Sequence, residues 1–226
     1  MKLLITRPLP AAVMQAAALR FDVTARHSTM PLDAAELRAA LRDFDAVLPT
    51  LGDQFSAQVF ADVPQPRARI LANFGVGYNH IDVQAARNAG IAVSNTPGAV
   101  TDATADVALT LILMTARRAG EGERLLRAGN WQGWHPTQML GAQVSGRRVG
   151  IIGMGRIGKA IARRCHYGFG MQVVFHNRSA VDDAGCPAEQ LPLAQVMAAD
   201  FVVVAVPGGP ATRHLINAET LAHMAP

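Results

Sequence analysis

A glycine-rich turn between an apolar strand and a helix constrains the fold of this chain more than any other feature. Val149–Ile152 is predicted to be a buried strand, the turn Gly153-Met154-Gly155-Arg156-Ile157-Gly158 follows it, and a helix then continues through Tyr167. A second apolar strand, Gln172–Phe175, comes about twenty residues after the turn, as in dinucleotide-binding βαβ units. The order of these elements predicts the first half of a doubly wound nucleotide-binding domain.

Each glycine of this turn has its own expected role. Gly153 permits the tight turn, Gly155 lets a pyrophosphate approach the backbone, and Gly158 lets the helix and the strand pack closely. The free N–H groups and the positive dipole end of the following helix favour phosphate. We therefore predict a dinucleotide site, and the alternative is a turn that only joins a strand to a helix.

The residues after the second strand indicate which dinucleotide binds. Sites for NAD place Asp or Glu there to hold the ribose 2′-hydroxyl, whereas this sequence has the neutral Asn177. Arg178 can pair with a 2′-phosphate, and the Ser179 hydroxyl can donate a hydrogen bond to it. The sequence favours NADP(H), and NAD(H) remains the alternative if Arg178 is only a solvated loop residue.

Short apolar runs alternate with helical segments in the first hundred residues, which predicts a parallel sheet covered by helices. Strands are expected at 2–6, 46–48, 69–73 and 91–94, and helices at 10–20, 33–42 and 82–88. A hinge at Thr96-Pro97-Gly98 separates this part from a long helix at 102–118, which Thr101 or Asp102 would cap. Further on we expect a loop-rich arm at 120–146, a strand at 201–206 and a helix from Asn217 to Met224.

Composition excludes several classes of protein. Half of the 226 residues are apolar and 17% are charged, which excludes a disordered chain. Two cysteines exclude a disulfide scaffold and a cysteine-based zinc site, and we expect no metal. The net charge of +4 comes from scattered basic residues without interleaved aromatic ones, so we expect no nucleic-acid partner.

The hydropathy of the chain bears on its location. No apolar run approaches the length of about 18 residues that a membrane span needs. The N-terminal apolar stretch is interrupted at Arg7 and Pro8, which makes it too short for a signal peptide. We expect no membrane partner and a cytoplasmic location.

Four motifs together resemble the D-isomer-specific 2-hydroxyacid dehydrogenases, and most closely their glyoxylate/hydroxypyruvate reductase branch. They are Asn73–Asp82, Asn95–Gly98 with the helix after it, Val149–Gly158 and Val206–Thr212, and they occur in order along the chain. The resemblance implies an α/β protein with a flavodoxin-like parallel-sheet substrate domain, its N-terminal part at 1–98. It also implies an incomplete, truncated Rossmann (doubly wound) domain for NAD(P) at 99–226.

The resemblance also implies roles for individual residues. The backbone N–H groups of Val76 and Gly77, in a bend with Gly75, would hold the substrate carboxylate, since a glycine bend exposes donors to an anion. Leu51 is expected to line the substrate pocket. The residues expected to contact the cofactor are Thr104, Gly153, Met154, Gly155, Arg156, Ile157, Gly158, Asn177, Arg178, Ser179, Val206, Pro207 and Thr212.

The implied activity is hydride transfer from NADPH to a small 2-keto acid of the glyoxylate or hydroxypyruvate type, giving the D-2-hydroxy acid. The resemblance further implies a homodimer formed through 102–146. The family's catalytic arginine, glutamate and histidine have no counterpart in this chain and would lie beyond Pro226. We therefore expect a C-terminally truncated chain that is inactive alone, and we assign no catalytic role to His80 near the substrate loop.

Two alternatives remain open. One is a non-catalytic dinucleotide-binding module, and the other is a phosphoglycerate- or formate-type dehydrogenase of the same fold.

Overall fold

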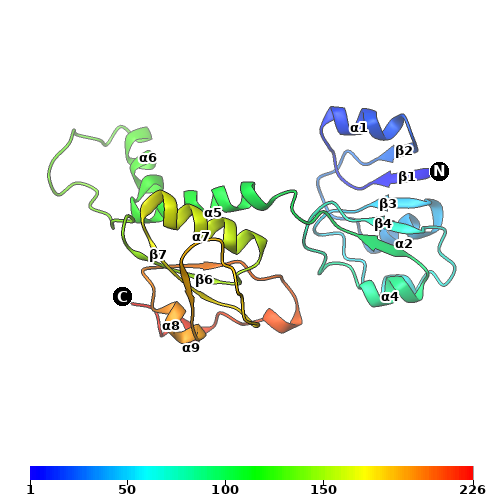
Figure 1. Ribbon diagram of the computed structural model, residues 1–226. Helices are drawn as coiled ribbons and strands as arrows, with labels where there is room; N and C mark the ends of the chain where they lie inside the picture. The colour runs from blue at the N-terminus through cyan, green and yellow to red at the C-terminus, as the bar shows by residue number, and fades with distance from the viewer. Residues whose placement is uncertain (226) are drawn as a thin grey trace. The chain divides into compact units, whose positions relative to one another are not determined.

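The computed structural model describes residues 1–225, and the chain divides into two compact units, Met1–Ala99 and Val100–Pro226 (Figure 1). Each unit is built on one parallel β-sheet with helices on its faces, as the alternation of apolar runs and helical segments predicts. The α/β fold class is confirmed.

The first unit carries a five-stranded sheet in the order β2-β1-β3-β4-β5, and every neighbouring pair is parallel. This is the flavodoxin-like order, in which the chain crosses back between the first and the third strand. The elements are β1 (Lys2–Ile5), α1 (Ala11–Ala18), β2 (Asp22–Ala25), α2 (Ala34–Asp43), β3 (Ala46–Leu48), α3 (Ala57–Ala61), β4 (Ile70–Ala72), α4 (Val83–Asn88) and β5 (Ala92–Ser94).

Alternate residues of the strands build two apolar layers in this unit. Leu3 and Ile5 of β1 pack in a cluster with Met14 of α1, whereas Leu4 lies in a larger cluster that includes Leu37 of α2. Helix α2 begins at a capping box, because Asp33 accepts from the backbone of Ala35 and Glu36 at 2.8 Å each. The two layers fix the carboxyl ends of β1, β3 and β4 on one edge of the sheet.

The second unit carries a four-stranded parallel sheet in the order β8-β7-β6-β9. The chain moves outward from β6 to β7 and β8, then crosses to the other side of β6 to form β9. The elements are α5 (Thr101–Ala116), α6 (Ala119–Arg127), β6 (Arg148–Ile152), α7 (Arg156–Phe169), β7 (Gln172–His176), β8 (Ala188–Gln190), α8 (Leu193–Met197), β9 (Phe201–Val204), the 3₁₀ turn Pro210–Thr212 and α9 (Ala218–Leu221).

Helices cover both faces of this second sheet as well. Helices α5 and α7 run side by side and share one apolar cluster with β6 and β7, whereas Val196 and Met197 of α8 pack in the cluster of the other face (Figure 1). Arg164 of α7 joins the two helices through Asp102 and Asp106 of α5, at 3.0 and 2.7 Å. The strand, turn and helix predicted from 149 onward are confirmed.

The structure corrects several local predictions. Part of the segment expected to be a loop-rich arm forms helix α6. Gly120 and Gly122 made this segment resemble a loop, but exposed ion pairs such as Glu123–Arg127 stabilise the helix. Helix α5 follows Val100, and neither Thr101 nor Asp102 caps it. Four further short elements are not predicted by the sequence pattern, because each has only three to five residues and too few alternating apolar positions: β2, α3, β8 and α8.

Two classes of feature are absent from residues 1–225. No helix among them is both long and apolar enough to cross a membrane. Nor do their His, Cys, Asp and Glu side chains gather into a group of three or more that could hold a metal ion.

Candidate functional site

The glycine turn lies at the carboxyl edge of the second sheet, between the ends of β7 and β9. Gly153 donates its N–H to the carbonyl of His176 at 2.8 Å, and Ala205 donates to the carbonyl of Ile152 at 2.8 Å. These bonds bring together three segments that are distant in sequence: 153–155, 176–179 and 205–207. Successive strands are added on one side of β6 up to β8 and on its other side at β9. Open α/β sheets bind ligands at the carboxyl edge where the strand order reverses in this way.

The three glycines of the turn differ in what requires them. Gly153 has a φ of 97°, and a Cβ there would lie 2.8 Å from the carbonyl oxygen of Ala205. A Cβ on Gly158 would clash with the carbonyl of Gly153. Both glycines are therefore required by the packing of the protein itself, as predicted for the tight turn and for close helix–strand contact.

Gly155 is not explained by packing. Its φ of −82° suits any residue, and a Cβ there would meet no atom within 4 Å. Helix α7 begins directly after it, and the first N–H groups of a helix have no acceptor within the helix. A bare backbone beside free donors fits the pyrophosphate of a dinucleotide, so the residues present suit that cofactor.

The segment after β7 lies against this turn. Asn177 accepts a hydrogen bond from the N–H of Met154 at 3.2 Å and donates to the carbonyl of Ser179 at 3.0 Å. Arg178 is exposed between them and forms no ion pair with any carboxylate in residues 1–225. The neutral Asn177 thus orders the segment, and the Arg178 guanidinium beside it has no carboxylate partner in residues 1–225.

The loop after β9 completes this edge. Val206 lies beside the turn, with its Cγ1 2.9 Å from where a Cβ on Gly153 would be. The Thr212 hydroxyl donates to the carbonyl of Pro207 at 2.6 Å and closes the loop. Thr104 lies on the exposed side of α5, and no hydrogen bond links it to these segments in the part of the chain that the structure describes.

A second set of free donors lies in the first unit, in the bend after β4. Gly75 has a φ of 151°, and its carbonyl accepts from the N–H of Thr96 at 3.0 Å. The amide of Asn73 donates to the carbonyls of Gly75 and Gly77 at 3.2 and 2.9 Å, and the amide of Asn95 donates to that of Val76 at 2.9 Å. All three carbonyls of the bend are therefore held by the protein.

Two N–H groups of this bend, unlike its carbonyls, have no hydrogen-bond partner in residues 1–225. No hydrogen-bond acceptor among residues 1–225 reaches the N–H of Val76 or of Gly77. Consecutive free N–H groups on a glycine bend form a concavity that suits an anion such as a carboxylate. The sequence analysis singled out these donors but missed Asn73 and Asn95, the amides that turn the carbonyls away.

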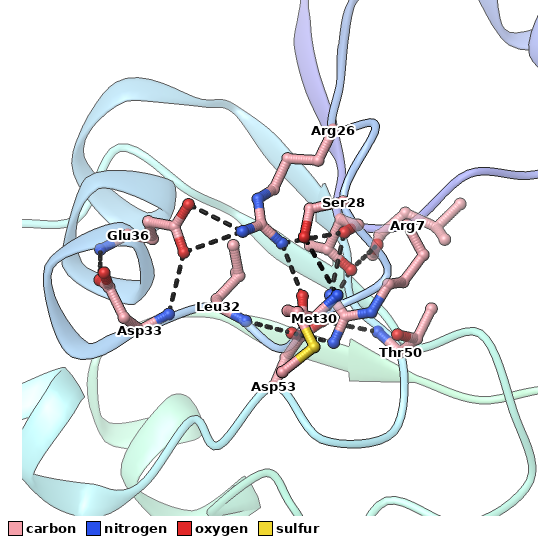
Figure 2. Close-up of polar contacts among 11 residues, drawn as sticks. Arg7, Arg26, Ser28, Met30, Leu32, Asp33, Glu36, Thr50 and Asp53 are labelled. Atoms are coloured by element: carbon pink, nitrogen blue, oxygen red, sulfur yellow. Dashed lines mark hydrogen bonds and ion pairs between the residues drawn. The ribbon is translucent and has the colours of Figure 1, made fainter.

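Leu51, the other expected substrate contact, lies in the turn after β3 with 64% of its surface exposed. The neighbouring Asp53 is fully buried and fixes this turn (Figure 2). Its carboxylate accepts from the backbone N–H of Leu32 (2.9 Å) and Thr50 (3.0 Å) and the hydroxyl of Thr6 (2.6 Å), and pairs with the guanidinium of Arg7 (3.1 Å). Asp53 therefore joins the Leu51 turn to the carboxyl end of β1.

Two further titratable groups, His80 and Cys165, are buried outside these sites. His80 is 4% exposed, neither ring nitrogen has a partner in the described residues, and burial lowers its pKa below the usual histidine range. Burial likewise raises the pKa of the Cys165 thiol to about 11. A neutral imidazole and a protonated thiol that are shielded from solvent do not suit acid–base or nucleophilic roles.

Comparisons with known proteins identify relatives of the whole chain. Residues 109–226 match the family described as "D-isomer specific 2-hydroxyacid dehydrogenase, NAD binding domain". A glyoxylate reductase of Thermococcus onnurineus (strain NA1) is 39% identical over 232 residues, which cover 100% of this chain and 69% of that protein. A glyoxylate reductase of Thermococcus kodakarensis is 40% identical over 227 residues, covering 97% and 67%.

A solved structure agrees with these relatives. The crystal structure of the TT0316 protein from Thermus thermophilus is 37% identical to this chain and superposes with a TM-score of 0.89. The superposition covers 99% of this chain and 70% of that one.

Proposed function

Because the chain belongs to the D-isomer-specific 2-hydroxyacid dehydrogenase family, we propose that it binds NADP(H) in preference to NAD(H), together with a small 2-keto acid of the glyoxylate or hydroxypyruvate type. The first unit would bind the acid and the second unit the dinucleotide. The observation that carries the cofactor preference is Arg178, an exposed guanidinium without a carboxylate partner in residues 1–225, beside the glycine turn. When bound, the nicotinamide supplies the hydride that turns the keto acid into a D-2-hydroxy acid.

The free N–H groups of Val76 and Gly77 support the substrate proposal. A 2-keto acid carries a carboxylate that these two donors would bind, while the exposed Leu51 would contact the carbon skeleton. Glyoxylate and hydroxypyruvate are small enough that orientation by the carboxylate decides how the carbonyl is presented. The names of the two curated relatives, both glyoxylate reductases, agree with a substrate of this size.

We assign no catalytic residue to this chain. Reduction of a ketone requires a proton donor for the carbonyl oxygen, and the resemblance to the family assigns that role to none of the seven histidines. We therefore expect the 226-residue chain to bind NADPH without oxidising it when glyoxylate or hydroxypyruvate is added. The loss of nicotinamide absorbance measures this directly, and turnover would show that a proton donor lies among these residues.

Replacing Arg178 tests the cofactor preference. In Arg178→Ala the affinity for NADPH should fall by about 1–3 kcal/mol, the size of a charge-assisted hydrogen bond, whereas the affinity for NADH should not change. Fluorescence titration with each dinucleotide gives both dissociation constants. Arg163→Ala removes another exposed arginine of the same unit and serves as the control for net charge. Equal losses for NADPH and NADH would remove the role proposed for Arg178.

We also propose that two copies associate through 102–146. Val107 and Leu111 on α5 are each 58% exposed, and Trp134 in the following segment is 80% exposed. Large apolar side chains exposed in one region are typical of a protein–protein interface. In a two-fold interface each substitution occurs twice. Leu111→Asp should therefore yield monomers in light scattering, whereas Leu19→Asp, at a leucine that is 87% exposed in the first unit, should not. A monomeric parent chain would contradict the proposal.

The cytoplasmic location expected from the sequence stays a prediction.

A further inference from the structure

The segment that carries Arg178 is held from its far side by one amide. Gln190, the last residue of β8, donates from Nε2 to the carbonyls of Asn177 and Ser179 at 3.2 and 3.1 Å. Its Oε1 accepts from the N–H of Val181 at 3.1 Å. One side chain therefore fixes three backbone groups across five residues, 177–181.

Asn177 holds the same segment from the near side. Its amide links the glycine turn, through the N–H of Met154, to the carbonyl of Ser179. The carbonyl of Ser179 thus accepts from two amides, Asn177 and Gln190. The backbone on both sides of Arg178 is hydrogen-bonded to Asn177 and Gln190. The Arg178 side chain itself forms no ion pair with a carboxylate in residues 1–225.

We propose that Gln190 is a positioning residue for dinucleotide selection, which fixes segment 177–181 so that Arg178 and Ser179 meet a 2′-phosphate without rearrangement. This inference rests on the proposed NADP(H) preference. The side chain of the exposed Gln190 donates two hydrogen bonds and accepts one, and the sheet needs none of them, because β8 already pairs with β7 through its backbone. A segment ordered before the ligand arrives spares the binding step the cost of ordering it.

The chemistry of the glutamine matters as much as its reach. Both donors of its amide are directed to carbonyls and its oxygen to an N–H, so a carboxylate in its place could keep only the bond to Val181. A glutamate would also bring a negative charge close to the place where a 2′-phosphate would bind. Gln190→Glu and Gln190→Leu therefore disturb the segment in different ways and should both lower selectivity for the phosphate.

The test compares two probes that differ only in the 2′-phosphate, 2′,5′-ADP and 5′-AMP, bound to the full chain and followed by calorimetry. In Gln190→Leu the preference for 2′,5′-ADP should fall about tenfold while the affinity for 5′-AMP changes less than about twofold. Gln190→Glu should show the same loss. Gln172→Leu is the matched control, since Gln172 is an exposed glutamine of the adjacent strand whose side chain makes no hydrogen bond within residues 1–225.

A second background separates positioning from direct contact. In Arg178→Ala, adding Gln190→Leu should lower the remaining preference much less than it does in the parent chain, because most of the effect of Gln190 passes through the Arg178 side chain that the segment presents. Additive losses would overturn the inference.

The outcomes distinguish the two proposals. If the parent chain binds both probes equally, the NADP(H) preference fails and the role of Gln190 fails with it. If the parent discriminates and both Gln190 variants discriminate as well, only the inference about Gln190 is overturned. An equal loss for both probes would indicate a purely structural role and would also overturn it. If Gln190→Leu does not fold, Gln190→Met, which has nearly the same length as glutamine and adds no charge, decides.

Discussion

Gly155→Ala is expected to weaken the binding of both NADPH and NADH more than tenfold, by over about 1.4 kcal/mol, and to lower the stability by no more than about 1 kcal/mol. A Cβ at this position meets no protein atom within 4 Å and sits on a backbone with a φ of −82°, so the fold accepts it. In the proposed site it would occupy the space where the pyrophosphate approaches the backbone. The effect on binding is thus separated from any effect on folding.

Two measurements on the same variant test this separation. Fluorescence titration gives the dissociation constants, and urea denaturation should give a free energy of unfolding within about 1 kcal/mol of that of the parent, since Gly155 is the N-cap of α7 and alanine is less favourable there than glycine. Gly168→Ala is the control, because Gly168 lies near the end of α7 and its Cβ would also meet nothing within 4 Å. Normal NADPH binding by Gly155→Ala would show that the pyrophosphate does not lie at this turn.

Local sequence patterns were sufficient for much of the fold. The glycine turn could be predicted because its strand, turn and helix are contiguous in the sequence. The Cβ clash that requires glycine at 158 is also local, whereas the clash at 153 is with Ala205, which is distant in sequence. The short edge strands β2 and β8 could not be predicted, because pairing with a neighbouring strand, rather than their own composition, makes them strands. Helix α6 was not predicted because its two glycines are typical of a loop, although its ion pairs favour a helix.

The residues that support the candidate sites were less predictable than the residues expected to touch ligands. Asn95 bonds to a carbonyl 19 residues away, Gln190 to one 13 residues away, and Asp53 to a hydroxyl 47 residues away. No periodicity encodes such contacts, since they depend on which strand ends become neighbours in the sheet. A usable signal was present, however. Asn95 and Gln190 lie at or directly after the end of a strand, and Asp53 lies in the turn that follows β3, so all three are at the carboxyl edge of a parallel sheet, where ligands bind.

The bend in the first unit shows why the supporting residues matter. Val76 and Gly77 could be singled out as donors from the sequence, but a bend alone does not decide whether its N–H groups or its carbonyls are available. The amides of Asn73 and Asn95 decide it, because they bind the three carbonyls and leave two N–H groups without an acceptor in residues 1–225. Availability of the donors is therefore a tertiary property of the unit.

Gly153→Ala is the variant for which we expect the largest loss of stability, about 2–5 kcal/mol for the second unit. Two costs add at this position. An alanine must adopt a φ of 97°, and its Cβ must lie within 3 Å of the carbonyl carbon and oxygen of Ala205, which are backbone atoms that cannot rotate away. Relief requires the end of β9 to move from β6, and the hydrogen bond from Ala205 to Ile152 would be lost.

Gly146→Ala separates the two costs in chemical denaturation. Gly146 has a φ of 74° but a Cβ there would meet nothing within 4 Å, so only the conformational cost of about 1 kcal/mol remains. Hydrogen exchange should show faster opening of β6 and β9 in Gly153→Ala and unchanged protection in the first unit. Equal losses of stability in Gly153→Ala and Gly146→Ala would mean that β9 can move away from the added Cβ without a cost in free energy. The carboxyl edge would then be too pliable to hold the turn in a geometry suited to a pyrophosphate, and the steric reason given for Gly153 would fail with it.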